Sequence, residues 1–170
     1  YLQLARRPPA QLGEESLHAI VREVVALVAP ELAQAQVALT TQAPDIGPVL
    51  ADGNQIRQAL LNVLRNAVEA GAHTLRLELA TDGARVTLAL HDDGPGMTEV
   101  ERDKALDPFF STKASGTGLG LAITKQILED HGGTVEIAPS PLGGTTVTLV
   151  LAHRTPSTGR VDAADRAGGR

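Results

Sequence analysis

Two glycine clusters, separated by a long irregular segment, constrain this chain more than any other feature. The first cluster, DDGPGM, begins at Asp92, and the second, GTGLGL, covers residues 116–121. A Phe-Phe pair lies between them, and the next strand-like segment is far downstream, so the first cluster does not close a hairpin. Glycine lets the backbone approach a ligand closely, because it has no side chain. The sequence therefore predicts a binding pocket here.

Length and composition favour one domain with a hydrophobic core. The chain has 170 residues, of which 42% are hydrophobic, and a chain of this size buries roughly 70% of the surface that it exposes when unfolded. It contains no cysteine, which excludes disulfides and thiolate metal sites and fits a reducing compartment, so we expect a cytoplasmic location. No apolar run reaches the ~20 residues of a membrane helix, and the N-terminus lacks a signal-peptide pattern.

Charge and aromatic content limit the class of partner. The net charge is -5, and the chain has one Tyr, two Phe and no Trp. A nucleic-acid surface needs basic patches and stacking aromatic residues, so we expect no nucleic-acid partner. The chain begins with Tyr1 rather than Met, which indicates a piece of a longer protein, and that protein can carry a membrane anchor.

Hydrophobic periodicity predicts a fold of helices alternating with paired strands. Apolar residues at three and four spacing predict helices, and strict alternation around Asp82-Gly83 predicts a hairpin. These elements together predict an α+β fold, a two-layer α/β sandwich whose mixed, mostly antiparallel sheet is covered on one face by about three helices. The predicted helices are 16–36, 52–70 and 118–131, and the predicted strands are 36–42, 49–51, 74–79, 85–90, 134–138 and 145–152.

Proline and a loss of periodicity mark the predicted domain boundaries. Pro8 and Pro9 cannot continue a helix, so residues 1–13 are predicted to be the end of an upstream helix and a linker. The tail 153–170 is rich in Arg, Asp, Ala and Gly and is predicted to be disordered. The folded domain is then expected to cover residues 14–152.

The helix at 52–70 carries amide side chains on a second face, beside its apolar one. Asn62 and Asn66 are one turn apart, although asparagine is a poor residue for the interior of a helix. One interpretation is a solvated face. The alternative is that Asn66 offers a neutral oxygen to Mg²⁺ beside phosphates, because Mg²⁺ prefers oxygen and takes few protein ligands. Asn62 would then lie over the reacting phosphate.

The two glycine clusters predict two parts of a nucleotide pocket. Asp93-Gly94 alone is typical of an ordinary turn, but Gly96 gives a second point of close backbone approach. The Asp93 carboxylate would then accept a hydrogen bond from an exocyclic amine such as that of adenine. GTGLGL opens a helix, and uncovered amides at a helix start form an anion site that suits a phosphate chain. Its spacing matches neither the dinucleotide fingerprint nor a P-loop.

Four ordered motifs give the sequence a family resemblance. The order NVLRNAVEA, DDGPGM, DPFFSTK and GTGLGLAI, followed by GGTTVTL, resembles the N, G1, F and G2 boxes of the histidine-kinase-type ATPase superfamily, which includes gyrase, the Hsp90 chaperone and MutL. The resemblance covers residues 16–152. It implies the Bergerat ATP-binding fold, with ATP and Mg²⁺ between the N-box helix and a mobile lid at 97–115. This short lid resembles that of nitrogen-regulatory and sporulation sensor kinases.

The resemblance also implies a role for individual residues. Asn66 would ligate Mg²⁺, Asn62 would assist at the phosphates, and Asp93 would bind the adenine amine, with Thr145 supporting Asp93 or a water. Lys113 is implied at the γ-phosphate, although a solvated lid lysine is an equal alternative. The remaining implied nucleotide-binding residues are Gly94, Gly96, Met97, Phe110, Gly116, Thr117, Gly118, Leu119, Gly120 and Leu121, with Phe109 and Phe110 latching the lid.

The first N-box position bears on the reaction. Family members that hydrolyse ATP have a glutamate there, whereas this chain has Asn62, which cannot act as a base. This favours phosphoryl transfer to a protein side chain, where positioning and charge neutralisation dominate. Glu69 lies roughly two turns along the helix from Asn62 and is no obvious substitute.

The resemblance implies a protein histidine kinase of a two-component system, but no histidine here fits the acceptor. The family's acceptor begins a His-Glu or His-Asp motif on an upstream dimerisation domain, and only His91-Asp92 matches, at a strand end. We therefore expect the acceptor domain to lie upstream, in a homodimeric parent protein with a response regulator as partner, and this fragment to be monomeric. A non-catalytic nucleotide-binding module and an ATPase of the same superfamily remain as alternatives.

Overall fold

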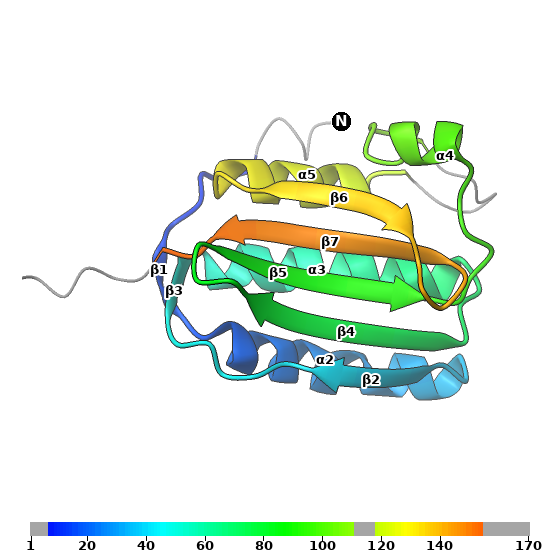
Figure 1. Ribbon diagram of the computed structural model, residues 1–170, viewed down its shortest axis with the longest axis horizontal. Coiled ribbons are helices and arrows are strands. Elements are labelled where there is room, and N and C mark those ends of the chain that lie inside the picture. Colours follow the sequence, from blue (N-terminus) through cyan, green and yellow to red (C-terminus); the bar gives the residue numbers. More distant parts are fainter. Residues whose placement is uncertain (1–6, 111–117, 155–170) are drawn as a thin grey trace, which may run out of the picture.

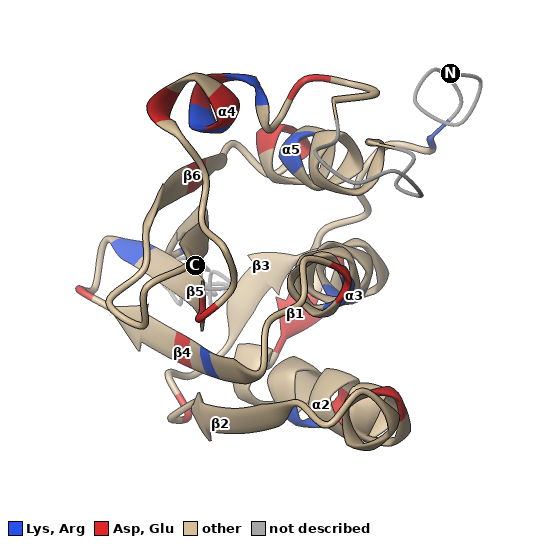
Figure 2. Cartoon of the chain, turned by 90° about the vertical axis from the view of Figure 1, so that its right-hand side faces the viewer, with Lys and Arg blue, Asp and Glu red and all other residues tan. Residues whose placement is uncertain are grey.

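The computed structural model describes residues 7–110 and 118–154, which form two layers (Figures 1 and 2). One layer is a five-stranded sheet in the order β2-β4-β5-β7-β6, and the other consists of three helices on one face of that sheet. β2 and β4 are parallel, and every other neighbouring pair is antiparallel. The predicted α+β sandwich is confirmed. The strands in sheet order are β2 (Ala38–Gln42), β4 (Thr74–Thr81), β5 (Arg85–Asp92), β7 (Thr145–Ala152) and β6 (Thr134–Pro139), and the helices are α2 (Leu17–Gln34), α3 (Gly53–Glu69) and α5 (Gly120–Asp130).

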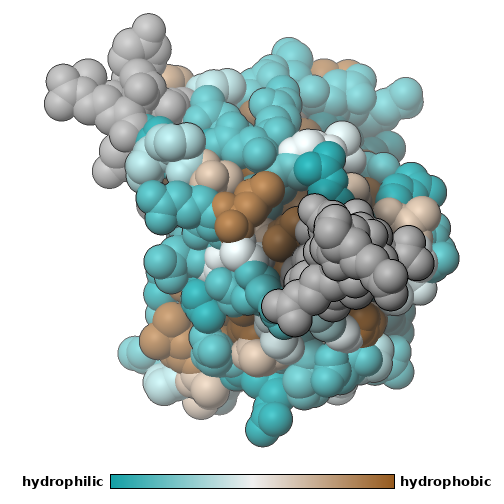
Figure 3. Space-filling model, turned by 90° about the vertical axis from the view of Figure 1, so that its left-hand side faces the viewer, coloured by the Kyte–Doolittle hydropathy of each residue, from teal (hydrophilic) through white to brown (hydrophobic). Residues whose placement is uncertain are grey.

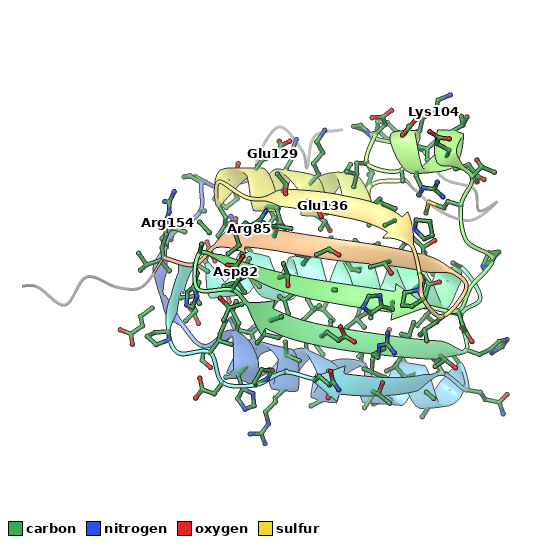
Figure 4. All side chains as sticks on the ribbon, viewed as in Figure 1. Asp82, Arg85, Lys104, Glu129, Glu136 and Arg154 are labelled. Carbon is green, nitrogen blue, oxygen red and sulfur yellow. The ribbon has the colours of Figure 1, made fainter. Side chains whose placement is uncertain are left out.

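The β4–β5 hairpin forms as its alternating sequence predicts. Leu77 pairs with Leu90 and Leu79 with Leu88, and all four side chains are buried against the helices. At the turn, the Asp82 carboxylate accepts the N–H groups of Ala84 and Arg85, at 2.9 and 2.7 Å, and Figure 4 shows Asp82 and Arg85 together there. Period-two alternation thus fixes which face of each strand meets the core.

Side-chain caps fix the starts of the two longest helices. Ser16 Oγ accepts the N–H of Ala19 at 3.2 Å, and Asp52 Oδ1 accepts the N–H of Gln55 at 3.2 Å. Each bond satisfies a backbone donor that has no partner within the helix. α3 lies between α2 and α5 and packs against both, so its position determines the geometry of the helical layer.

The N-terminal segment is bound to the domain more closely than a linker would be. β1 (Gly13–Glu15) pairs antiparallel with β3 (Val49–Ala51), a pairing that the sequence analysis did not predict. Before it, Arg7 donates to Gln55 Oε1 at 3.1 Å and to Asp130 Oδ2 at 2.6 Å, so the segment is fixed at the start of α3 and the end of α5. Figure 3 shows this end of the molecule, which has small apolar areas among mostly hydrophilic atoms.

The C-terminal boundary also lies slightly beyond the predicted one. The His153 N–H donates to Ala84 O and the Leu50 N–H donates to Arg154 O, both at 2.9 Å. His153 and Arg154 therefore belong to the folded domain and not to a disordered tail. Residues 155–170 lie outside the described residues, so their predicted disorder remains a prediction.

A short helix occupies the beginning of the predicted lid. α4 (Glu99–Lys104) projects beyond the sheet (Figure 1) and contains charged residues of both signs (Figure 2). Thr98 and Glu101 form a reciprocal capping box at its start, a local signal that the sequence analysis did not use. Residues 111–115, the end of the predicted lid, lie outside the described residues.

None of the helices within residues 7–110 and 118–154 has the length and apolar character needed to cross a lipid bilayer.

Candidate nucleotide site

A pocket lies between the second half of α3 and the lid segments, at the C-terminal end of β5. α3 forms one wall, the start of α5 and Phe110 form a second, and the segment Pro95–Met97 forms a third. Leu90 and Val147, from the adjacent strands β5 and β7, close its floor. The pocket therefore brings together described residues of both glycine clusters and the amide face of α3.

The α3 wall presents polar side chains to the pocket. Asn62, Arg65, Asn66 and Glu69 follow the three-and-four spacing of one helix face and all line the pocket. Asn62 Nδ2 donates to Gly120 O at 3.3 Å, which joins α3 directly to the first turn of α5. The predicted amide face is thus part of the pocket and not a purely solvated surface.

Of the two adjacent aspartates in the first glycine cluster, Asp92 lines the pocket and Asp93 does not. Asp92 is buried, and its Oδ1 accepts the N–H groups of Gly94 and Thr145 at 2.9 and 3.0 Å. Asp93 Oδ1 instead accepts the N–H groups of His73 and Thr74, at 2.8 and 2.9 Å, outside the pocket lining. The expectation that Asp93 faces the adenine base is therefore wrong.

Strand alternation explains this correction. Val86, Leu88, Leu90 and Asp92 all lie on the buried face of β5, because successive side chains of a strand point to opposite faces. Asp93 follows Asp92 and points the other way, where its two backbone donors, Thr74 first and then His73, lower the pKa of its carboxyl. The periodicity used for the hairpin would have identified Asp92.

Two glycines are required for close backbone contacts around the pocket. A Cβ on Gly144 would lie 2.1 Å from Asp92 Oδ1 and 2.5 Å from the Gly94 nitrogen, so the turn before β7 can approach Asp92 only as glycine. Gly118 has a φ of +69°, and its Cβ would lie 2.3 Å from the Phe109 carbonyl carbon. The Phe109 N–H donates to Gly118 O at 3.0 Å, so these two segments lie directly side by side.

The start of α5 is the candidate anion site. Its N-cap residue, Leu119, has no polar side-chain group, and no side chain in the described part of the chain caps this end. Thr124 Oγ1 donates to Gly120 O at 2.8 Å inside the first turn. Backbone N–H groups at such a helix start point outward and favour an anion.

The donor chemistry of the pocket fits a magnesium ion that is held mainly by phosphates. The described residues contain no group of three or more His, Cys, Asp or Glu side chains that could hold a metal by themselves. Asn62 and Asn66, which line the pocket, carry neutral amide oxygens, and Mg²⁺ commonly takes one or two protein ligands together with phosphate oxygens and water.

The sequence profile of one family matches this part of the chain. The family is described as histidine kinase-, DNA gyrase B-, and HSP90-like ATPase, and the match covers residues 51–155, which includes every described element of the pocket. The chain belongs to this ATPase family.

Similar proteins within the ATPase family are sensor kinases. The chain is 36% identical over 154 residues to the signal transduction histidine-protein kinase AtoS of Escherichia coli K12, covering 88% of this chain and 25% of AtoS. It is 38% identical over 157 residues to the sensor histidine kinase ZraS of Klebsiella oxytoca, covering 88% of this chain and 33% of ZraS. The chain thus spans a quarter to a third of the length of these relatives.

A solved structure confirms the ATPase fold. The nucleotide-free catalytic domain of the histidine kinase ThkA superposes with a TM-score of 0.76 at 29% identity, covering 84% of this chain and 96% of that domain. The architecture of this chain is therefore that of a histidine kinase catalytic domain.

The structure brings most of the residues expected from the ATPase family to the pocket. Asp93, Gly94 and Leu119 do not line it, although the Gly94 N–H donates to Asp92. Lys113, Gly116 and Thr117 lie outside the described residues. Phe109 is exposed and does not line the pocket, whereas Phe110 does. The expected residues that line it are Asn62, Asn66, Gly96, Met97, Phe110, Gly118, Gly120, Leu121 and Thr145.

Sequence reasoning did not name three residues that the structure places at or beside the pocket, namely Asp92, Gly144 and Arg65. Asp92 was detectable from strand alternation, and Gly144 from its place in the GGTT motif. Arg65 was detectable from helical spacing, because it is three residues after Asn62 and four before Glu69 and therefore lies on the same face of α3.

Proposed function

We propose that this domain binds Mg-ATP and transfers the γ-phosphoryl group to a histidine on a dimerisation domain of its parent protein. The observation that carries the proposal is the pocket itself, in which a buried carboxylate, two α3 amides and the start of α5 surround one cavity. The carboxylate matches a base that carries an amine, the two amides match a metal-bound phosphate, and the helix start matches a phosphate chain. Membership of the ATPase family and the sensor-kinase relatives support the same reading.

Asp92 is the residue that we assign to the adenine base. Both backbone donors, from Gly94 and Thr145, bond to Oδ1, and we assign Oδ2 as the acceptor of the adenine amine. An ionised carboxylate only accepts hydrogen bonds, so Asp92 prefers an amino group to a carbonyl at that position. Gly96, Met97 and Thr145 form the surrounding walls.

Asn62, Asn66 and the start of α5 are the groups that we assign to the phosphates. Asn66 would contribute its amide oxygen to Mg²⁺, and the amides that follow Gly118 would bind phosphate oxygens. When bound, magnesium neutralises part of the triphosphate charge. The remaining task of this chain is to position the phosphates for transfer. The Asn62–Gly120 hydrogen bond supports this, because it holds α3 against α5.

The pocket favours transfer over hydrolysis. Asn62 holds the first N-box position, and a neutral amide is too weak a base to take a proton from water. Its Nδ2 donates to Gly120 O instead. None of the five histidines lines the pocket. His91, the one followed by an acid, instead bonds through Nδ1 to Thr146 Oγ1 at 2.7 Å. The acceptor is therefore assigned to another domain of a cytoplasmic, homodimeric two-component kinase that signals to a response regulator.

A phosphotransfer assay tests the proposal. The domain is incubated with γ-labelled ATP, magnesium and the dimerisation domain of the same parent protein. We expect label on that domain that is stable in alkali and lost in acid, as for phosphohistidine. Free phosphate released at a comparable rate without the acceptor would indicate a hydrolase instead, and nucleotide binding without either product would indicate a regulatory module.

A further inference from the structure

Arg65 is a cationic side chain at the rim of the candidate nucleotide pocket. It lies on α3 between Asn62 and Asn66, and it is the one basic residue among the described residues of the pocket lining. The charged residues that line the pocket with it, Glu69 and Asp92, are acidic. A phosphate chain entering this pocket would therefore meet a single fixed cation on α3.

The Arg65 guanidinium is held by a carboxylate on the neighbouring helix. Its Nε and Nη2 donate to Oε2 and Oε1 of Glu31 on α2, at 3.2 and 2.8 Å. The two side chains are 49% and 51% exposed, so water and salt compete with the pair and it contributes little to stability. Glu31 is thus a partner that Arg65 can leave.

A second ion pair repeats this arrangement outside the pocket. Arg57 on α3 donates from Nε to Glu23 Oε2 on α2 at 2.7 Å. Arg57 lies eight positions before Arg65, and Glu23 lies eight positions before Glu31. Arg57 does not line the pocket. The two pairs join the same two helices in the same register, but only one has its cation at the pocket.

We propose that Arg65 is a phosphate-binding residue, which exchanges Glu31 for the phosphate chain of the nucleotide. The proposal rests on the proposed function. The flat fork of a guanidinium bonds to a phosphate with the same two-point geometry as to a carboxylate. A di- or triphosphate carries more negative charge than one glutamate, so it outcompetes Glu31, while Glu31 limits the affinity. Arg65 would thereby favour ATP and ADP over AMP.

Nucleotide titrations of matched variants test this assignment. Calorimetry with ATP, ADP and AMP is compared for the unmodified domain, Arg65→Gln, Arg57→Gln, Glu31→Ala and Glu23→Ala. We expect Arg65→Gln to weaken ATP binding about tenfold, as for loss of a charged hydrogen bond, with a much smaller effect on AMP. Glu31→Ala should tighten ATP binding by about two- to threefold, because it removes the competitor. Arg57→Gln and Glu23→Ala should leave all three affinities unchanged.

Specific outcomes overturn the assignment. Equal losses of ATP affinity in Arg65→Gln and Arg57→Gln would show that the Arg65–Glu31 pair only joins the helices. An unchanged or weaker ATP affinity in Glu31→Ala would show that Glu31 does not compete with the phosphates for Arg65. Arg65→Lys, which keeps the charge without the fork, should lose part of the ATP affinity even if Arg65→Gln fails to fold. If the unmodified domain binds no adenine nucleotide, the proposed function itself is refuted. If the unmodified domain binds ATP but both Arg65 variants bind it equally tightly, only the role of Arg65 is refuted.

Discussion

Two neighbouring aspartates at the end of β5 have different structural roles. Asp92 turns toward the helices and is buried at the pocket, where it holds the N–H groups of Gly94 and Thr145. Asp93 turns to the opposite face and accepts the N–H groups of His73 and Thr74 at the start of β4. A one-residue shift in a strand exchanges the two faces, so register and not residue type determines which aspartate lines the pocket.

Substitution of the two aspartates separates these roles. Asp92→Asn should weaken adenine nucleotide binding by about 10- to 100-fold, because the amide either loses an acceptor for the base or leaves a buried donor unpaired. Asp93→Asn should change the affinity less than about twofold, since Asp93 is outside the pocket. Calorimetry with ATP measures both. A greater loss in Asp93→Asn than in Asp92→Asn would reverse our assignment.

The stability of the domain should fall in acid partly through Asp93. The N–H groups of Thr74 and His73 lower the pKa of the Asp93 carboxyl in the folded state. A carboxyl whose pKa is lowered by folding stabilises the protein fully above its unfolded pKa of about 4, and this stabilisation is lost as the pH falls through the lower folded pKa. Urea denaturation at pH 6 and at several values below pH 4 should therefore show a smaller loss of stability for Asp93→Asn than for the unmodified domain. Asp103→Asn, an exposed residue of α4, is the control, and an identical pH profile for all three proteins would contradict the prediction.

Elements with local signals were predicted well, whereas those that depend on distant partners were not. The caps of α2 and α3 and the alternation of β4 and β5 lie within a few residues of the elements that they specify. β1 has three residues and forms only because β3 pairs with it from more than thirty residues away, so no local periodicity reveals it.

The candidate site also contains some features that local sequence reveals and others that depend on distant contacts. The amide face of α3 follows from helical spacing, and its residues line the pocket. The contact that requires Gly144 joins the turn before β7 to the end of β5, which is visible only in three dimensions. The role of Lys113 remains a prediction, because that residue lies outside the described residues.

Two helix caps of the same kind should have different effects on stability. Ser16→Ala should lower the global free energy of unfolding by about 1 kcal/mol, because α2 packs into the core and unfolds with it. Thr98→Ala removes the capping box of α4, which has no buried residue, so it should raise amide hydrogen exchange in α4 while global unfolding stays the same. Urea denaturation and hydrogen exchange measure the two effects, and an equal global loss in both variants would indicate that α4 unfolds together with the core.

At the scale of the whole molecule, stability comes from the contact between the sheet and the helical layer. Leu77, Ile56 and Ile127 are fully buried and come from β4, α3 and α5. One continuous core thus includes both layers, and we expect the domain to unfold as a single cooperative unit.

Matched leucine substitutions test the cooperative core. Leu77→Ala should lower the free energy of unfolding by about 2–5 kcal/mol, because it leaves a cavity between the layers. Leu27→Ala should change it by less than about 0.5 kcal/mol, because Leu27 is 60% exposed on α2. Both are measured by urea denaturation, and two separate transitions in either protein would contradict a single core.

The two ends of α3 have different neighbours. The chain arrives at its first turn, where the Gln11 N–H donates to Asp52 Oδ2 at 2.9 Å and Arg7 binds Gln55, while the pocket lies along its last two turns. Its 17 residues make α3 a lever arm of about 25 Å. A tilt of about 10° at the tethered end displaces the far end by about 4 Å over that length. A small rotation where the chain enters would therefore move the pocket wall that α3 forms by more than the length of a hydrogen bond.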